Sequence, residues 1–235
     1  MTDTGHEPSP NGGGTAPVAG PAPITPEFSV VAVTAAEDTA APALRFHLEV
    51  AETSGRDVFT IALTAQINID PARRGYDAET RERLTDLFGE PERWAATTHS
   101  FLWAHATTLV PSFAGSTRFT ILVPCSYDLE LAAAKYFYSL PADEVPLSFH
   151  FSGSILHRGE DGQVQVVLVP WSCSAQWKMP VEIWRGMMQR FYPNGAWARL
   201  HADTVARLRR RQVERGSVSL DACIAELLDN AGEET

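Results

Sequence analysis

The chain of 235 residues is 44% hydrophobic and 20% charged, which is typical of a globular protein with a sizeable core. Its formal net charge of -10 argues against a broad nucleic-acid surface, because phosphate binding requires clustered lysine and arginine. The first residues lack the basic and apolar regions of a secretory signal, and no apolar run reaches the roughly 18 residues of a membrane span. We therefore expect a cytoplasmic protein without membrane insertion and, with widely spaced cysteines at 125, 173 and 223, reduced thiols.

Composition and residue pattern divide the chain into three segments. Residues 1–26 are rich in proline and glycine and offer almost nothing to bury, so we predict a disordered extension there. Residues 27–215 are predicted to form a single domain, with mainly strands over 27–170 and helices over 180–215. Residues 216–235 are predicted to form a C-terminal helix and an acidic tail.

Strand patterns dominate the first part of the domain. Between Leu44 and Val50, apolar and polar residues alternate, which predicts one buried and one solvated face. A hairpin is expected around the turn GEDG. The strands are predicted at 28–35, 43–52, 57–70, 99–113, 115–124, 145–158 and 163–171. We infer an α+β fold: an antiparallel sheet of about six or seven strands covered by helices, with a helical C-terminal segment.

Two helices are expected to interrupt these strands. Asp77 is suited to cap a helix that ends before Gly89. In the stretch 126–140, apolar residues follow helical spacing and three consecutive alanines favour a helix over a strand. This second helix is predicted to begin near Ser126 or Asp128, where carboxylates are favoured by the helix dipole.

A tryptophan-rich stretch, VPWSCSAQWKMPVEIWRGMMQRFYPNGAW, holds four of the six tryptophans and three of the four methionines. Helical spacing from Pro180 places Trp184, Met187, Met188 and Phe191 on one stripe, which predicts a packing role for them. Outside that periodicity, three residues lie in what reads as a connector. These residues, Trp171, Trp177 and Met179, are candidate partner-binding residues, because aromatic and methionine side chains adapt to apolar surfaces.

The last helices carry the one basic run of an acidic chain, RLRRRQVER. A helix beginning near Trp197 is expected to end at Gly216, and Ser217 or Ser219 is suited to cap another. Arginines on a solvated helix face are the common case, but an acidic partner is an alternative. The candidates for that contact are Arg207, Arg210 and Arg211, and their partner is either another protein or the chain's own Asp221, Glu226 and Asp229.

Catalytic and metal-binding patterns are weak. His99 and His105 are too far apart to share one metal ion. Ser152 and Ser154 lie near His150 and His157 in sequence, but the Gly-x-Ser-x-Gly turn of hydrolases is absent. We therefore predict no catalytic residue, no metal site and no cofactor.

Several segments carry a family resemblance: VPCSYDLELAAAKYF, EVPLSFHFSGSI, VPW, MPVEIW and FYPNGAWARLHADT. They resemble an actinobacterial family, domain of unknown function number 6084, over about residues 27–212. Its members stand near genes of uptake nickel–iron hydrogenases, so the resemblance implies an accessory or maturation role. The order of strands, helix and VPLSF is also similar to the export chaperone SecB, although Pro124 precedes Cys125 here and that chaperone has no counterpart of the C-terminal helices.

The expected function is that of a non-enzymatic accessory protein that binds another protein, and the resemblance implies hydrogenase assembly as its setting. A homo-oligomer is compatible with this expectation. One alternative is a small-molecule-binding or enzymatic domain with a pocket between the sheet and the tryptophan-rich segment. Converging polar groups such as Glu182, Arg185 and His150 would favour it. Another alternative is a structural subunit of a larger complex.

Overall fold

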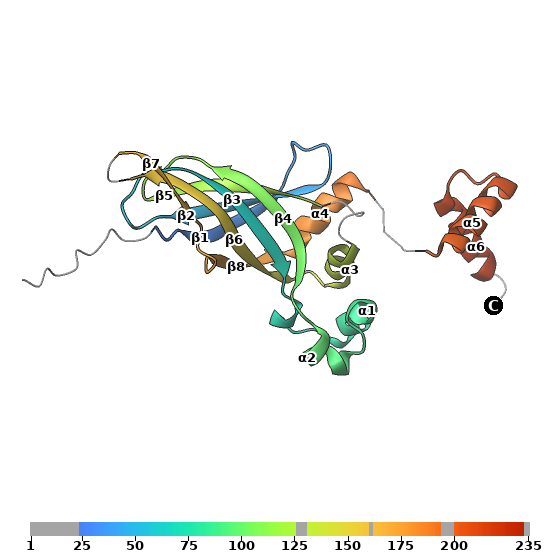
Figure 1. The fold of residues 1–235 in the computed structure, drawn as a ribbon. Helices are drawn as coiled ribbons and strands as arrows, with labels where there is room; N and C mark the ends of the chain where they lie inside the picture. The colour runs from blue at the N-terminus through green and yellow to red at the C-terminus, as the bar shows by residue number, and fades with distance from the viewer. Residues whose placement is uncertain (1–23, 126–130, 160–161, 194–199, 233–235) are drawn as a thin grey trace, which may run out of the picture. The chain divides into compact units, whose positions relative to one another are not determined.

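The computed structural model describes residues 24–125, 131–159, 162–193 and 200–232 (Figure 1). Residue contacts divide the chain into two compact units, Met1–Phe191 and Tyr192–Thr235, and each is described by itself. The predicted extension at 1–26 lies largely outside the described residues, but Ile24 near its end is buried in the core. The last helix shares the second unit with the helix before it.

The first unit is built on two antiparallel sheets, which confirms the predicted α+β class. The smaller sheet has the order β1-β2-β5 and the larger has β4-β3-β6-β7, with β8 also paired to β6. The strands are β1 (Glu27–Ala35), β2 (Ala43–Ala51), β3 (Val58–Ile69), β4 (Phe101–Val110), β5 (Ser116–Pro124), β6 (Glu144–Arg158), β7 (Val164–Leu168) and β8 (Ser174–Pro180). The predicted hairpin around GEDG is the β6–β7 pair.

The core lies between the two sheets. Phe46 on β2 packs edge-on against Phe149 of β6 at 5.4 Å and against Trp103 of β4 at 6.0 Å between ring centroids. The alternation predicted for β2 is confirmed, since Leu44, Phe46, Leu48 and Val50 are all fully buried. Most of the strands have one apolar face, and they bury these faces by pairing as two sheets instead of forming one wide sheet.

Strand β6 organises the larger sheet. One edge pairs with β3 along nearly its whole length, and the other edge is divided between β8, opposite Glu144–His150, and β7, opposite Ser154–Arg158. At the change of neighbour stands Gly153, whose φ is 144°. A Cβ there would lie 2.0 Å from the carbonyl oxygen of Ala62, so only glycine fits this close approach.

The helices of the first unit gather at one end of the sheets (Figure 1). They are α1 (Ala78–Phe88), α2 (Trp94–Thr97), α3 (Leu131–Ser139) and α4 (Val181–Phe191), with short 3₁₀ turns at Pro71–Arg73 and Pro91–Arg93. The predicted cap is confirmed, because the Asp77 carboxylate accepts a hydrogen bond of 2.7 Å from the Thr80 amide. The start predicted for α3, at Ser126 or Asp128, lies outside the described residues.

The second unit pairs α5 (Ala202–Arg215) with α6 (Leu220–Gly232). Gly216 ends α5 in the left-handed conformation, with φ of 68°, as the sequence predicts. The Ser219 hydroxyl accepts a hydrogen bond of 3.0 Å from the Ala222 amide and so caps α6. Cys223 is fully buried on the side of α6 that faces α5. The expected helix start near Trp197 lies outside the described residues, and α5 begins at Ala202.

Candidate functional site

The stretch predicted as a connector is largely a strand, so that interpretation is wrong for residues 174–179. In β8, Ala175, Trp177 and Met179 point towards the core, while the residues between them are exposed. Met179 is fully buried, which removes its side chain from any surface that a partner touches. Trp177 is half-buried, with its ring 6.2 Å from Phe46. The sequence of β8 does alternate with a period of two, but the alternating run is short and ends at a proline, so it is a weak strand signal.

Trp171 occupies the opposite environment. Its side chain is 93% exposed, on the loop between β7 and β8. Both ends of this loop are fixed to β6: the Val169 amide donates to the Gly153 carbonyl, and the Phe151 amide donates to the Cys173 carbonyl, each at 3.0 Å. Such an exposed tryptophan on an anchored loop is a candidate contact residue, because tryptophan is enriched among the residues that dominate binding energy.

The strand before this loop adds exposed apolar surface. Val164, Val166 and Leu168 of β7 are 60%, 60% and 74% exposed. Strand β7 is an edge strand without a charged residue, and such edges are ready to pair or pack with another chain. We call these three side chains together with Trp171 the β7 edge.

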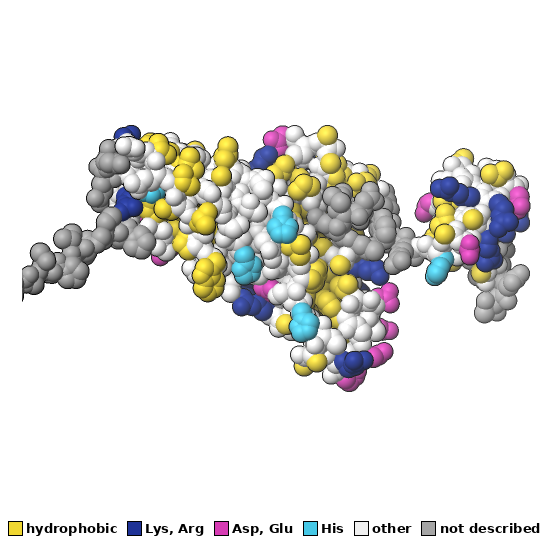
Figure 2. Space-filling model, viewed as in Figure 1, with side chains coloured by type: hydrophobic (Ala, Val, Ile, Leu, Met, Phe, Trp, Pro, Cys, Tyr) yellow, Lys and Arg dark blue, Asp and Glu magenta, His cyan; other side chains and the backbone are white. Residues whose placement is uncertain are grey.

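A row of uncharged side chains extends inward from the β7 edge. Leu168 lies opposite Ser154 on β6, Ser154 opposite Ala62 on β3, and Ala62 opposite Leu109 on β4, which is 71% exposed. Directly opposed residues share one face of a sheet, so this row crosses the outer face without a charge. Figure 2 shows hydrophobic side chains towards the β7 end of the molecule, and mostly uncharged side chains over the middle of this face.

The residues considered for catalysis do not converge. Arg185 pairs with Glu182 at 2.8 Å and donates to the carbonyl oxygens of Phe137 and Leu140, so it holds the end of α3. His150 lies on the exposed face of β6, opposite Gln66. The histidine and serine residues at 150–157 are also separated, because His157 is fully buried whereas Ser152 is exposed.

Two features near β8 and β3 have structural explanations. Trp177 borders a depression of about 520 Å³, in which Lys178 and Glu144 form an ion pair of 3.8 Å.

The buried carboxylate of Asp70 accepts hydrogen bonds from the Ser100 and Ser148 hydroxyls, and so ties the end of β3 to its neighbours. In the described ranges, no group of three or more His, Cys, Asp or Glu side chains is arranged to hold a metal ion.

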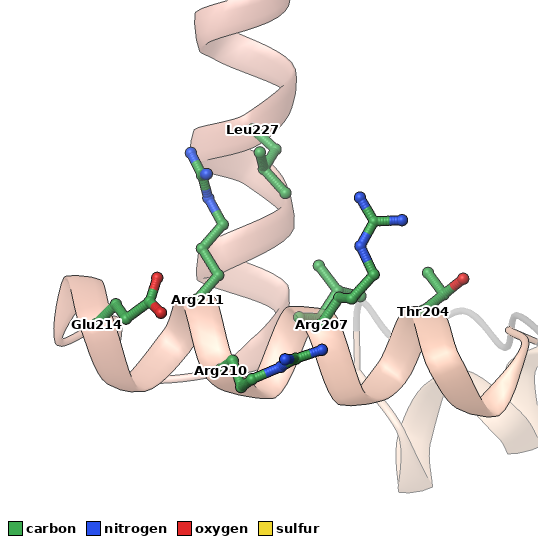
Figure 3. Close-up of a pocket in the computed structure, with 7 residues that line it drawn as sticks. Thr204, Arg207, Arg210, Arg211, Glu214 and Leu227 are labelled. Atoms are coloured by element: carbon green, nitrogen blue, oxygen red, sulfur yellow. The ribbon is translucent and has the colours of Figure 1, made fainter.

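The predicted arginines line a cavity of about 520 Å³ between α5 and α6 (Figure 3). Arg207 and Arg211 rise from the same side of α5, and Leu227 faces them from α6. Among the described residues, Arg207, Arg210 and Arg211 form no salt bridge, and the Nε of Arg211 is buried without a hydrogen-bond partner. We call this cavity the arginine groove; it is lined by Thr204, Arg207, Leu208, Arg210, Arg211, Glu214 and Leu227.

The acidic residues of α6 do not neutralise this groove. Within residues 200–232, no salt bridge joins its arginines to Asp221, Glu226 or Asp229. Glu226 instead accepts hydrogen bonds of 3.3 Å from the Ser217 hydroxyl. The contact between the basic run and these three carboxylates, one of the two expected alternatives, is therefore not formed in the described part of the chain.

The fold and these surfaces define an α+β protein with two facing antiparallel sheets, an exposed apolar edge and a separate helical pair. The chain belongs to a family of unknown function, DUF6084, whose model matches residues 24–235. No curated protein matches the chain. Within the described residues, no helix has both the length and the apolar character needed to cross a membrane.

The similar solved structures are distant in sequence and in fold. A β-glucosidase from Kluyveromyces marxianus is 11% identical with a TM-score of 0.27, and the match covers 66% of this chain but 15% of that one. The putative ApaA protein from Bordetella pertussis is 9% identical with a TM-score of 0.27, over 67% and 94% of the two chains. A putative late embryogenesis abundant protein is 14% identical with a TM-score of 0.27, over 66% and 71%.

Proposed function

We propose that this protein is a non-enzymatic accessory protein that binds another protein through the β7 edge. The observation that carries the proposal is the 93% exposure of Trp171 on a loop whose two ends are hydrogen-bonded to β6. Covering a large apolar side chain that is exposed to water is favourable, because its apolar surface is removed from water. Because the loop is already anchored, binding orders few additional residues.

The exposed apolar side chains of β7 and the uncharged row across the outer face support the same role. Val164, Val166 and Leu168 extend the contact surface along an edge strand, and Leu109 continues it across the outer face. Contiguous exposed apolar surface on a folded protein is typical of interaction sites. The separation of His157 from Ser152, and the structural engagement of Arg185, favour binding over catalysis.

The family resemblance gives the proposal its cellular setting. Proximity of the family's genes to uptake hydrogenase genes points to a hydrogenase subunit or maturation factor as the partner, in the cytoplasm. The proposal does not include transfer of chaperone activity from SecB, because the second unit formed by α5 and α6 has no counterpart in that protein.

Affinity purification from native cytoplasm with mass spectrometry tests the proposal. The full chain, Trp171→Ala and a control, Leu102→Ala, are compared; Leu102 is 51% exposed on β4, away from the β7 edge. We expect a hydrogenase-related protein with the full chain and the control, and its loss with Trp171→Ala at unchanged melting temperature. Recovery of the chain alone under gentle conditions, or equal capture by all three, would contradict the proposal.

A further inference from the structure

The arginines of the second unit differ from most of those in the first. Arg45, Arg74 and Arg118 each pair with a carboxylate at 2.6–2.9 Å. In the arginine groove, by contrast, three guanidinium groups and the single carboxylate of Glu214 surround an open cavity, and none of the three has an ion-pair partner within the described ranges. The groove therefore carries a local positive charge on a chain whose net charge is -10.

We propose that the arginine groove binds an acidic peptide segment of a partner protein, one that bears several carboxylates and an apolar side chain. Guanidinium groups form bidentate, charge-assisted hydrogen bonds with carboxylates. The Nε of Arg211 is buried without a hydrogen-bond partner, so no acceptor within the described residues fixes this end of the guanidinium group. Leu208 and Leu227 offer the apolar wall for the remaining side chain.

The arrangement of the guanidinium groups favours an extended ligand over a compact anion. Figure 3 shows Arg207 and Arg211 rising from α5 with their guanidinium groups apart, while the Arg210 side chain extends along the helix. A phosphate ion needs donors that converge on one point. Spread donors instead match charges that are distributed along a chain, so a peptide with separated carboxylates fits better.

This inference rests on the proposed function, because the acidic segment belongs to a protein partner. It adds a second contact to that of the β7 edge, on the other unit of the chain. Two contacts on one chain raise the overall affinity when a partner engages both at once. The groove can nevertheless be tested without the partner, with the full chain and a synthetic peptide.

The experiment measures fluorescence anisotropy of a labelled peptide that alternates glutamate and leucine. Arg207→Gln combined with Arg210→Gln changes two exposed groove residues, so the fold should be retained, as circular dichroism checks. The matched control combines Arg209→Gln with Arg215→Gln, which removes the same charge from the same helix outside the groove. We expect the groove variant to weaken binding at least about tenfold, the control less than about twofold, and added salt to weaken the full chain's binding.

Three further probes give the test its other outcomes. A peptide with glutamine in place of every glutamate should not bind, whereas equal binding would overturn the proposal. Inorganic phosphate or a single-stranded oligonucleotide that binds more tightly than the acidic peptide would also overturn it, as would equal losses in the groove variant and the control. If the groove fails these tests while Trp171→Ala still abolishes partner capture, the inference falls and the proposed function stands.

Discussion

The hydroxyl oxygens of Tyr76 and Tyr136 lie 2.7 Å apart, and Tyr76 also donates to the Pro71 carbonyl oxygen at 2.7 Å. A phenol has one proton, so Tyr136 is the donor to Tyr76, and the chain of donors runs from α3 to the turn before α1. Tyr136 is fully buried. This relay joins two helical elements that are about 60 residues apart in the sequence, and its buried end, the Tyr136 hydroxyl, needs its partner.

The direction of the relay makes the two tyrosines unequal. Tyr76→Phe leaves the buried hydroxyl of Tyr136 without its acceptor and should cost about 1–3 kcal/mol of unfolding free energy. Tyr136→Phe removes a donor but leaves the Tyr76 bond to Pro71, and should cost about 1 kcal/mol. Urea denaturation of both variants measures the order. An equal or reversed order would show that Tyr136 finds another acceptor.

The same pair predicts a loss of stability at high pH. Burial raises the pKa of Tyr136 well above its ordinary value, and burial also raises the pKa of Tyr76. The folded state therefore holds both phenols protonated, while in the unfolded chain they ionise at about pH 10. Stability from this pair is present in full below that pH and declines as the pH rises above it. Thermal melts across that range should show a smaller decline for Tyr136→Phe, and an identical decline would contradict this linkage.

Gly153 and Gly186 predict opposite effects of the same substitution. Gly153→Ala places a Cβ 2.0 Å from the Ala62 carbonyl oxygen, with φ at 144°, and should destabilise the protein by at least about 3 kcal/mol. Gly186 lies in the exposed part of α4 with no heavy atom within 4 Å of an added Cβ. Gly186→Ala should therefore stabilise by about 0.5–1 kcal/mol. The melting temperatures of the two variants test this prediction. An unchanged melting temperature for Gly153→Ala would mean that β6 can shift away from β3.

The tryptophans give a further contrast. Trp184 on α4 is 1% exposed and packs against the Phe137 ring at 5.0 Å, so Trp184→Ala should cost about 3–5 kcal/mol through the cavity it leaves. Trp171→Ala should change the unfolding free energy by less than about 0.5 kcal/mol, because its side chain has almost no packing to lose. Guanidinium denaturation measures both. Similar losses for the two variants would show that Trp171 packs against the fold in solution.

Local patterns in the sequence predict the parts of the fold that depend on neighbouring residues. The alternation of β2, the Asp77 cap and the stop at Gly216 could all be read from a few residues, because each depends on strand or helix geometry alone. The division of strands into two sheets could not be predicted, since an apolar strand face looks the same in the sequence whichever sheet the strand joins. Strand pairing is set by contacts far apart in sequence, and no local pattern reports them.

The candidate site shows the same limit. In the sequence, Trp171 lies outside any packing periodicity and the three arginines lie in an unusual charge run, so both are visible as candidates. The same pattern points to Met179, yet its position on β8 buries it. The groove itself depends on where α6 crosses α5, and the uncharged row through Leu109 depends on strand register. Both are long-range properties that composition does not contain.

The sharing of β6 by two short strands has a consequence for how relatives of this protein can vary. The loop around Trp171 is attached to β6 at both ends, so a relative with more residues there would project a longer arm while each strand kept its place. Insertions between Val169 and Cys173 are thus separated from the folding of the sheet. The length and tip of this loop can therefore change without a change in the sheet beneath it.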